Sequence, residues 1–335
     1  MLNVTGINDS EIHYAHYNSV PWEGYIWFTL LTTGNVCGII GNALVIYCSM
    51  EYGSFKMDGA TIAFVRQIAI SDILFILIYS VPIAVTHLFH RWVLGSWVCL
   101  ILGHGVTVPV MASINFILAV SLHRYLRCKY PHSVREITAT KATQISIAIW
   151  LFSLALAIYN IASGKSVEFN GKLAACTFHF GHSAYNVGVM ILLTLFPFIA
   201  ITVINLILWV YVTNLLKQHS GSPTGRSNVA LLTTAAVTGL FWISWSATVV
   251  RFHYSAIVDE HDVSVGMEKA RYLYMLGAYG NPLIYTMVNR GFRDFIRHLL
   301  KRIYTKYMPF VKAKKNTVNI GQQNLPSSSH SSHTK

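Results

Sequence analysis

Seven long apolar segments run through this sequence, and they constrain its fold more than any other feature. A helix needs about 20 apolar residues to cross the hydrocarbon core of a bilayer. Charged residues make up only 11% of the chain, whereas soluble domains carry about 25%. The sequence therefore predicts an all-α membrane protein, a seven-transmembrane helix bundle. Its expected spans are residues 25–50, 60–88, 97–128, 141–162, 184–216, 229–256 and 268–289.

The basic residues fall mostly on one side of this predicted bundle. Six Lys and Arg lie on the side of the N-terminus and nineteen on the other side, where four acids accompany them. Basic loops stay in the cytoplasm, so the N-terminus is expected outside, and the net charge of +12 does not indicate nucleic-acid binding. Asn3 and Asn8 begin Asn-X-Ser/Thr sequences, which accept glycans outside the cell and agree with this orientation. Residues 1–24 have neither a basic start nor an apolar core, so no cleavable signal peptide is expected there.

Two of the five cysteines are expected on the oxidising side, and an odd count leaves at least one thiol unpaired. Cys99 begins the third segment and Cys176 lies in the loop after the fourth. A disulfide between them would hold that loop over the mouth of the bundle. Within the loop, Asn170-Gly171 separates two short alternating runs, which predicts a β-hairpin.

Four polar side chains are expected to meet in the bundle interior, because lipid offers them no hydrogen-bond partner. Asp72 is the only acid deep in a segment, and it indicates either an ion or proton site or a hydrogen-bonded structural carboxylate. The others are Asn42, Ser113 and Asn281. Pro282 should kink the seventh helix and free the carbonyl one turn earlier.

The segment that follows the seventh helix is amphipathic. In NRGFRDFIRHLLKRIY, aromatic and aliphatic side chains share one helical face and arginines and lysines lie elsewhere, which is typical of a helix in the membrane interface. The Ser-rich end of the chain predicts a disordered tail. The expected organisation is an extracellular glycosylated N-terminus at 1–24, the bundle at 25–290, the interfacial helix at 291–303 and a cytoplasmic tail at 304–335.

Particular residues mark the segments one after another. They are Gly41-Asn42, Asp72, Cys99, Arg124-Tyr125, Pro131, Trp150, Pro197 and Asn281-Pro282-Leu283-Ile284-Tyr285. Over roughly residues 25–303, this set and its intervals resemble the rhodopsin-like (class A) G-protein-coupled receptors. The resemblance implies a plasma-membrane receptor that binds an extracellular ligand and activates a heterotrimeric G protein by rearrangement of helices 6 and 7.

The resemblance also implies roles for single residues. Of two neighbouring tryptophans, Trp245 rather than Trp242 is assigned to the sixth-helix switch, because Phe241 then lies one turn below it. Asn42, Asp72, Ser113 and Asn281 would form a candidate Na⁺ site for an allosteric ion, with no other cofactor. The tail would carry phosphosites for arrestin at Ser327, Ser328, Ser329, Ser331, Ser332 and Thr334. The implied switch residues are His123, Arg124, Tyr125, Asn281, Pro282, Tyr285, Trp245, Phe241, Pro197 and Ile114.

Several residues depart from the family pattern. His123 replaces the acid that normally pairs with Arg124, so the inactive state is expected to be weakly locked and basal signalling high. Asn205 stands where the family usually has Tyr, and Ala247 where it has a kink-forming Pro. Pro109 and Gly277 stand where other ligands of the Na⁺ site often lie. A receptor-shaped ligand scavenger or scaffold that does not couple to G proteins is therefore the alternative function.

The ligand is constrained by what the outer half of the bundle contains. Val106 replaces the Asp of amine receptors, which disfavours a biogenic amine, and Met275 replaces the Lys of opsins, which excludes a retinal Schiff base. Arginine suits a carboxylate or phosphate, so a ligand with an anionic group, such as a peptide or a lipid, is one interpretation. Pairing of the arginines with acids in the last outer loop is the other. The hairpin-like loop resembles that of peptide receptors and favours a peptide. The candidate ligand-binding residues are Arg251, Arg271, His87, His104, His253, Tyr254 and Tyr274.

An enzyme is not expected. His179 and His182 have no third metal ligand in sequence reach, and no nucleophile and base converge. A transporter would more often show internal repeats and broken helices in both halves, and the sequence shows neither.

Overall fold

The computed structural model describes residues 21–51, 58–130, 137–164, 167–178, 188, 191–218, 225–255 and 269–307. The chain divides into two compact units, Met1–Phe292 and Arg293–Lys335. The first unit holds the helix bundle and a small hairpin. The second is considered separately.

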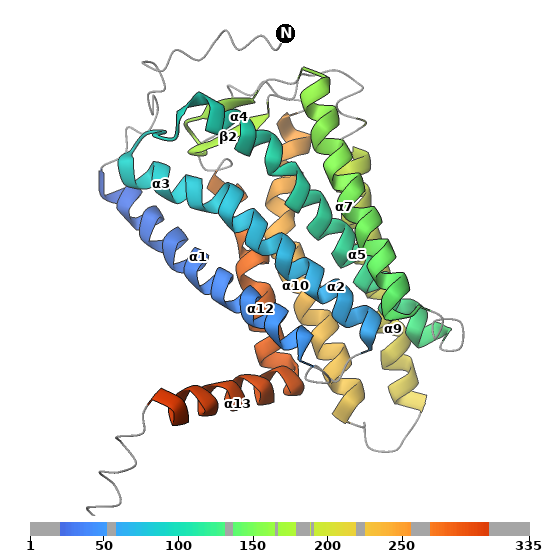
Figure 1. The fold of residues 1–335 in the computed structure, drawn as a ribbon. Helices are drawn as coiled ribbons and strands as arrows, with labels where there is room; N and C mark the ends of the chain where they lie inside the picture. Colours follow the sequence, from blue (N-terminus) through green and yellow to red (C-terminus); the bar gives the residue numbers. More distant parts are fainter. Residues whose placement is uncertain are drawn as a thin grey trace, which may run out of the picture. The chain divides into compact units, whose positions relative to one another are not determined.

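Long apolar helices run side by side through the first unit (Figure 1). Five helical stretches of the described residues are long and apolar enough to cross a membrane, and they end at Met50, Phe89, Lys129, Ala162 and Asn214. The sixth predicted span coincides with α10, which contains the shorter apolar stretch Thr238–Val250, and the seventh with η4 and α12. The helices of the bundle are α1 (Pro21–Met50), α2 (Gly59–Phe75), η1 (Ile76–Ser80), α3 (Val81–Phe89), α4 (Gly95–Gly105), α5 (Thr107–Lys129), α7 (Ala139–Ala162), η2 (Ile191–Leu195), α9 (Phe196–Gln218), α10 (Gly225–Ser255), η4 (Arg271–Tyr274) and α12 (Met275–Val288).

Prolines interrupt three of the predicted continuous spans. A π-helical turn, η1, separates α2 from α3 just before Pro82, and a second one, η2, precedes Pro197 in α9. The third span breaks at Val106, three residues before Pro109. Proline has no N–H for the carbonyl one turn earlier, so the helix widens or breaks where the hydrogen bond is lost.

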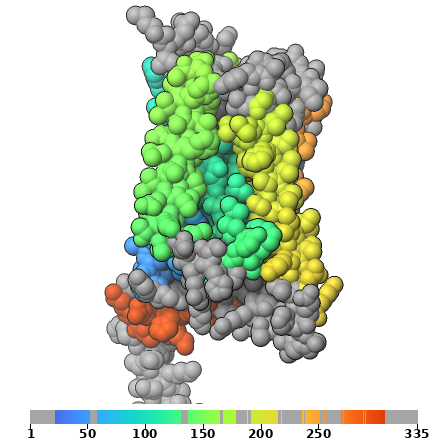
Figure 2. Space-filling model, turned by 90° about the vertical axis from the view of Figure 1, so that its right-hand side faces the viewer, coloured from blue at the N-terminus to red at the C-terminus, as the bar shows by residue number. Residues whose placement is uncertain are grey.

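The outward surface of the bundle is apolar. Figure 2 shows α7 and α9 on one face, with α5 visible between them. On α7, large apolar side chains such as Leu151 and Ile158 are exposed, at 62% and 55%. A helix that exposes such residues along its length requires an apolar surrounding, which a bilayer provides.

Close contact between α1 and α12 depends on glycine. A Cβ atom at Gly41 would lie 2.8 Å from the Cβ atom of Pro282, and real Cβ atoms do not approach so closely. Gly41 thus lets the part of α12 around Pro282 lie against α1.

A β-hairpin follows α7. Strands β1 (Val167–Asn170) and β2 (Ala175–Phe178) pair antiparallel, with Val167 opposite Phe178 and Asn170 opposite Ala175. The predicted hairpin is confirmed, but Asn170 ends β1 and the turn comprises residues 171–174, with Ala174 in the left-handed region at φ 58°. The predicted disulfide between Cys99 and Cys176 is present and ties β2 to α4.

The last helix, α13 (Arg290–Tyr307), extends beyond the end predicted for it. Asn289 precedes it as an N-cap, because its Oδ1 accepts a hydrogen bond from the N–H of Phe292 at 3.0 Å. In the second unit, Leu300, Ile303 and Tyr304 are exposed on this helix, and Arg297 pairs with Asp294.

Candidate functional site

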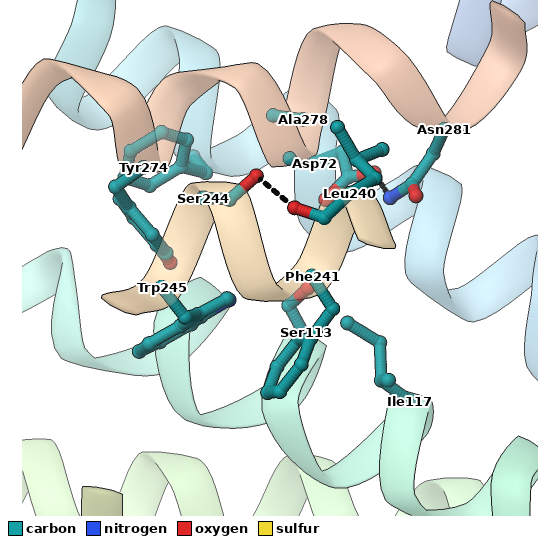
Figure 3. Close-up of a pocket in the computed structure, with 12 residues that line it drawn as sticks. Asp72, Ser113, Ile117, Leu240, Phe241, Ser244, Trp245, Tyr274, Ala278 and Asn281 are labelled. Carbon is teal, nitrogen blue, oxygen red and sulfur yellow. Dashed lines mark hydrogen bonds between the residues drawn. The ribbon is translucent and has the colours of Figure 1, made fainter. Parts of the chain in front are cut away.

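A small cavity lined by both polar and apolar side chains lies in the middle of the bundle (Figure 3). Asp72 of α2 is 3% exposed, and Asn281 of α12 donates a hydrogen bond from Nδ2 to its Oδ2 at 2.8 Å. Ser113 of α5 hydrogen-bonds to the same carboxyl group. The space open to the centre of a water molecule is ≈ 20 Å³, and a water needs about 10–15 Å³. The cavity therefore has room for one water or a small ion.

The oxygen atoms around this cavity are the kind that hard cations prefer. Asp72 offers a carboxylate, and Ser113 and Asn281 offer a hydroxyl and an amide oxygen. Gly277 also lines the cavity but contributes no side-chain ligand. Among the described residues, no group of three or more His, Cys, Asp or Glu could hold a metal ion.

Asn42, the fourth residue of the predicted cluster, is not among the residues that line the cavity. Its Nδ2 donates to the carbonyl of Ala278 at 2.9 Å, and to the carbonyl of Gly38 at 2.9 Å. Ala278 lies four residues before Pro282, so its carbonyl is the one that the proline leaves without an N–H donor. Asn42 satisfies that carbonyl and links α1 to α12 one turn before Pro282.

Aromatic rings close the cavity toward the end of the bundle at which α1 begins. Trp245 is buried, whereas Trp242 is 42% exposed, so the structure places the assigned tryptophan inside. The Trp245 ring lies 6.1 Å from Phe241 and meets Tyr274 edge-on at 4.6 Å between ring centroids. Ile114 belongs to the same buried cluster. Pro197 is buried, and the neighbouring Phe198 has its ring 5.4 Å from that of Phe241.

A charged cluster lies at the opposite end of the bundle. Asp58, at the N-cap of α2, accepts hydrogen bonds from the backbone N–H of Thr61 at 3.0 Å and from its hydroxyl at 2.8 Å. The same carboxylate forms an ion pair with Arg127 and lies 3.6 Å from Nε2 of His123. Because the Thr61 proton goes to Asp58, the hydroxyl accepts from Nδ1 of His123, 3.2 Å away.

Asp58 stays charged in this cluster. Burial alone would raise the pKa of Asp58, but the two hydrogen bonds from Thr61 and the nearby His123 and Arg127 hold it below its usual range. A carboxylate with a lowered pKa contributes stability above its unfolded pKa and loses it only as the pH falls through the folded value. The contribution is therefore complete at neutral pH.

This cluster was not predicted from the sequence, in which Asp58 and its ion pair with Arg127 had no assigned role. A local signal existed, since Asp three residues before Thr at the start of an apolar segment is typical of an N-cap. The approach of α5 to that cap is a tertiary contact, which no local pattern encodes.

Arg124 and Tyr125 of the predicted switch lie near this end. Arg124 is close enough to Tyr285 of α12 and to Asp58 for electrostatic interaction. Tyr125 accepts a hydrogen bond from Lys129 at 3.0 Å. Asn205 is buried, and its Nδ2 donates to Oγ of Ser121 at 3.0 Å and to the carbonyl of Ile201 at 2.9 Å.

The candidate ligand-binding residues do not form one described site. His87 is fully buried and its Nε2 lies 2.9 Å from the hydroxyl of Tyr272, whereas Tyr274 packs on Trp245. His104 is buried in α4, and Tyr254 is exposed. The side chains of Arg251, His253 and Arg271, the residues Asn3 and Asn8, and the serines of the tail lie outside the described part of the chain.

A second buried polar cluster was also missed. Oδ1 of Asn35 in α1 accepts from the hydroxyls of Ser80 at 2.6 Å and Tyr279 at 2.8 Å. These three side chains join α1, η1 and α12. Near the same end, Lys269 forms an ion pair with Glu23 at the start of α1.

Comparison with known proteins identifies a family. Residues 41–285 match the model of the 7 transmembrane receptor (rhodopsin family). The chain is 23% identical to chemokine XC receptor 1 of Homo sapiens over 87% of this chain and 88% of the relative. It is 23% identical to type-1 angiotensin II receptor B of Xenopus laevis over 96% and 93%, and 26% identical to melatonin receptor type 1A of Phodopus sungorus over 82% and 80%.

Proposed function

Because the chain belongs to the rhodopsin family of seven-transmembrane receptors, a class of multi-pass membrane proteins that are not enzymes, we propose that it is a signalling receptor. It binds a ligand outside the cell and activates a heterotrimeric G protein inside it. The proposed locations are the plasma membrane for the bundle, the outside for residues 1–24, the inner membrane face for the helix at 291–303 and the cytosol for the tail. Arrestin is the second proposed partner, through the Ser-rich tail.

A continuous path between the two ends of the bundle carries this proposal. Tyr274 and Trp245 are in ring contact above the cavity, and the cavity contains the hydrogen bond from Asn281 to Asp72. One helical turn further along α12, Tyr285 lies within electrostatic reach of Arg124. A shift of α12 at the outer end would therefore change the surroundings of Arg124, the residue we propose to contact the G protein.

The cavity gives the proposal an allosteric ion. Asp72, Ser113 and Asn281 would hold Na⁺, and Asn42 would support the site through its bond to the carbonyl freed by Pro282. An ion between α2, α5 and α12 would favour the arrangement in which these helices stay together.

The similar receptors do not indicate which class of ligand this chain binds. The relatives are named for three different ligands, chemokines, angiotensin II and melatonin, so they do not narrow the class. A peptide is favoured by the hairpin that stands over the bundle mouth, and a small anionic or lipid ligand is the competing class.

Constitutive nucleotide exchange tests the proposal. The chain and its Arg124→Ala variant are expressed in cells without ligand, and exchange is measured on a panel of Gα subunits at equal surface density. We expect a basal signal that Arg124→Ala abolishes, and that the control Lys141→Ala, at an exposed position in the first turn of α7, leaves unchanged. A basal signal that persists in Arg124→Ala would contradict the assigned role of this arginine.

The alternative is a receptor-shaped scavenger or scaffold. Two observations favour it, since His123 does not pair with Arg124 in the described contacts and Asn205 bonds within the bundle to Ser121. Internalisation of ligand without exchange on any Gα subunit would establish this alternative.

A further inference from the structure

The tip of the β-hairpin is buried in the end of the bundle at which α1 begins. Leu173, Ala174 and Ala175 are 0%, 1% and 2% exposed. Turns between strands normally lie on the surface, because their backbone groups need water or another partner. The buried second half of this turn, Leu173 and Ala174, must therefore find its partners inside the protein.

The partners of this turn are specific. The N–H of Leu173 donates to Oδ1 of Asn170 at 3.1 Å and to the Asn170 carbonyl at 3.2 Å. The carbonyl of Leu173 accepts a hydrogen bond from the hydroxyl of Tyr272 at 2.7 Å. Because that hydroxyl gives its single proton to Leu173, it accepts from Nε2 of His87, 2.9 Å away. The tip is thus the end of a hydrogen-bonded chain from α3 through η4.

The walls around the tip are apolar. Trp27 meets the Tyr272 ring edge-on at 4.9 Å, and it stacks on His87 at 6.3 Å. The tip belongs to one buried cluster with residues of α1, α3, η4 and α12. These residues include Leu31, Ile83, Ala84, Tyr272 and Met275.

We propose that this enclosure is a ligand site and that Leu173 is its tethered occupant. The site accepts an aliphatic side chain next to a peptide carbonyl, because those are the two groups that the apolar walls and the Tyr272 hydroxyl receive from the hairpin. An external ligand of the same chemistry, a peptide with a leucine-like side chain, would bind by displacing the tip. This ligand site deepens the proposed receptor function. Binding at the site does not itself require signalling.

The disulfide explains how so short a turn can hold the site. Cys176 follows the buried Ala175 directly and is bonded to Cys99 at the start of the third span. A tethered group competes at a high effective concentration and loses little entropy on binding. A free peptide must therefore bind well enough to overcome the tether.

Chemical accessibility tests the occupancy. Ala84→Cys places a thiol in the wall, and its labelling by a membrane-impermeant thiol reagent is followed on intact cells, with the parent chain as background. We expect labelling to be several-fold faster when Leu173→Ala is added, and unchanged with Glu168→Ala, an exposed position of the same hairpin. Tyr272→Phe removes only the donor to the Leu173 carbonyl and should give an intermediate labelling rate. This variant replaces Leu173→Ala in the test if Leu173→Ala does not reach the cell surface. Equal rates with and without Leu173 would overturn the proposal.

A synthetic probe tests the ligand class. Head-to-tail cyclic peptides of residues 167–178, with Ser in place of Cys176, carry either Leu or Ala at the position of Leu173. In the receptor with Ala84→Cys and Leu173→Ala, the Leu peptide should slow labelling several-fold and the Ala peptide should not. Equal protection by both peptides, by neither, or by a fatty acid alone would overturn the assigned class. Neither readout needs a G protein, so a failure of the signalling proposal would be seen separately.

Discussion

Among the described residues, Asp58 is an acid that interacts electrostatically with Arg124. It forms an ion pair with Arg127 and interacts electrostatically with Arg124 and His123. Asp58 lies at the N-cap of α2, so its ion pair with Arg127 connects the end of α5 to a neighbouring helix. An acid at position 123, next to Arg124 in the chain, would instead hold Arg124 directly. We infer that the restraint on Arg124 is weaker than a direct pair but not absent.

Asp58→Asn tests this restraint. Asn keeps the N-cap of α2, because Asn and Asp cap helices about equally well, and removes only the charge. Partly exposed ion pairs contribute about 0.2–1 kcal/mol, so basal exchange should rise by at most about fivefold. Asp294→Asn removes the charge of an exposed pair in α13 and is the matched control. A lower basal signal would contradict the assignment.

His123→Asp tests the weak lock from the other side. The new carboxylate would lie beside Arg124, and the positive charge of Arg127 would offset its repulsion from Asp58. Basal exchange should therefore decrease, by about the same factor by which Asp58→Asn increases it. Exchange is measured at equal surface density. An unchanged basal signal would show that His123 is not the cause of a weak lock.

At the scale of elements, glycine decides how closely α1 and α12 pack. A Cβ atom at Gly41 would have to displace the rigid ring of Pro282, whose Cβ lies 2.8 Å away. Overpacking of this kind costs about 1–3 kcal/mol.

Gly41→Ala should therefore lower the midpoint of thermal unfolding in detergent. Gly239→Ala in α10 is the control, since a Cβ atom there would meet nothing within 4 Å, and Ala is the better helix former. It should leave the midpoint unchanged or raise it. Equal effects of the two changes would show that α1 and α12 separate readily.

The helices and the centre of the site could be predicted from the sequence, whereas the other buried clusters could not. Asp72 and Asn281 are conspicuous because a polar group deep in an apolar span needs a partner, and they do bond to each other. Asn35 and Ser80 were missed because residues of this kind often bond to their own helix. Leu173 was missed because an apolar residue in a loop predicts burial without saying where.

At the scale of the whole molecule, charge and redox chemistry predict the same outward-facing end. The hairpin and its disulfide lie at the end where α1 begins, beside α3 and α4 (Figure 1). Disulfides persist in oxidising compartments, so this end is expected outside the cell. The Lys and Arg residues concentrate at the opposite end, and basic loops are expected in the cytosol. The two arguments use different atoms, so each tests the other.

Glycosylation at Asn3 and Asn8 would settle this orientation. With the N-terminus outside, both acceptors pass through the compartment where glycans are added, so removal of N-glycans by a glycosidase should increase the electrophoretic mobility of the chain. The double variant Asn3→Gln/Asn8→Gln should migrate like the deglycosylated chain and show no further shift. A tag after Lys335 should meanwhile be detected only after the cells are permeabilised. Detection of that tag on intact cells would reverse the orientation, and it would place Arg124 and the charged cluster around Asp58 on the outer face, where no G protein could reach them.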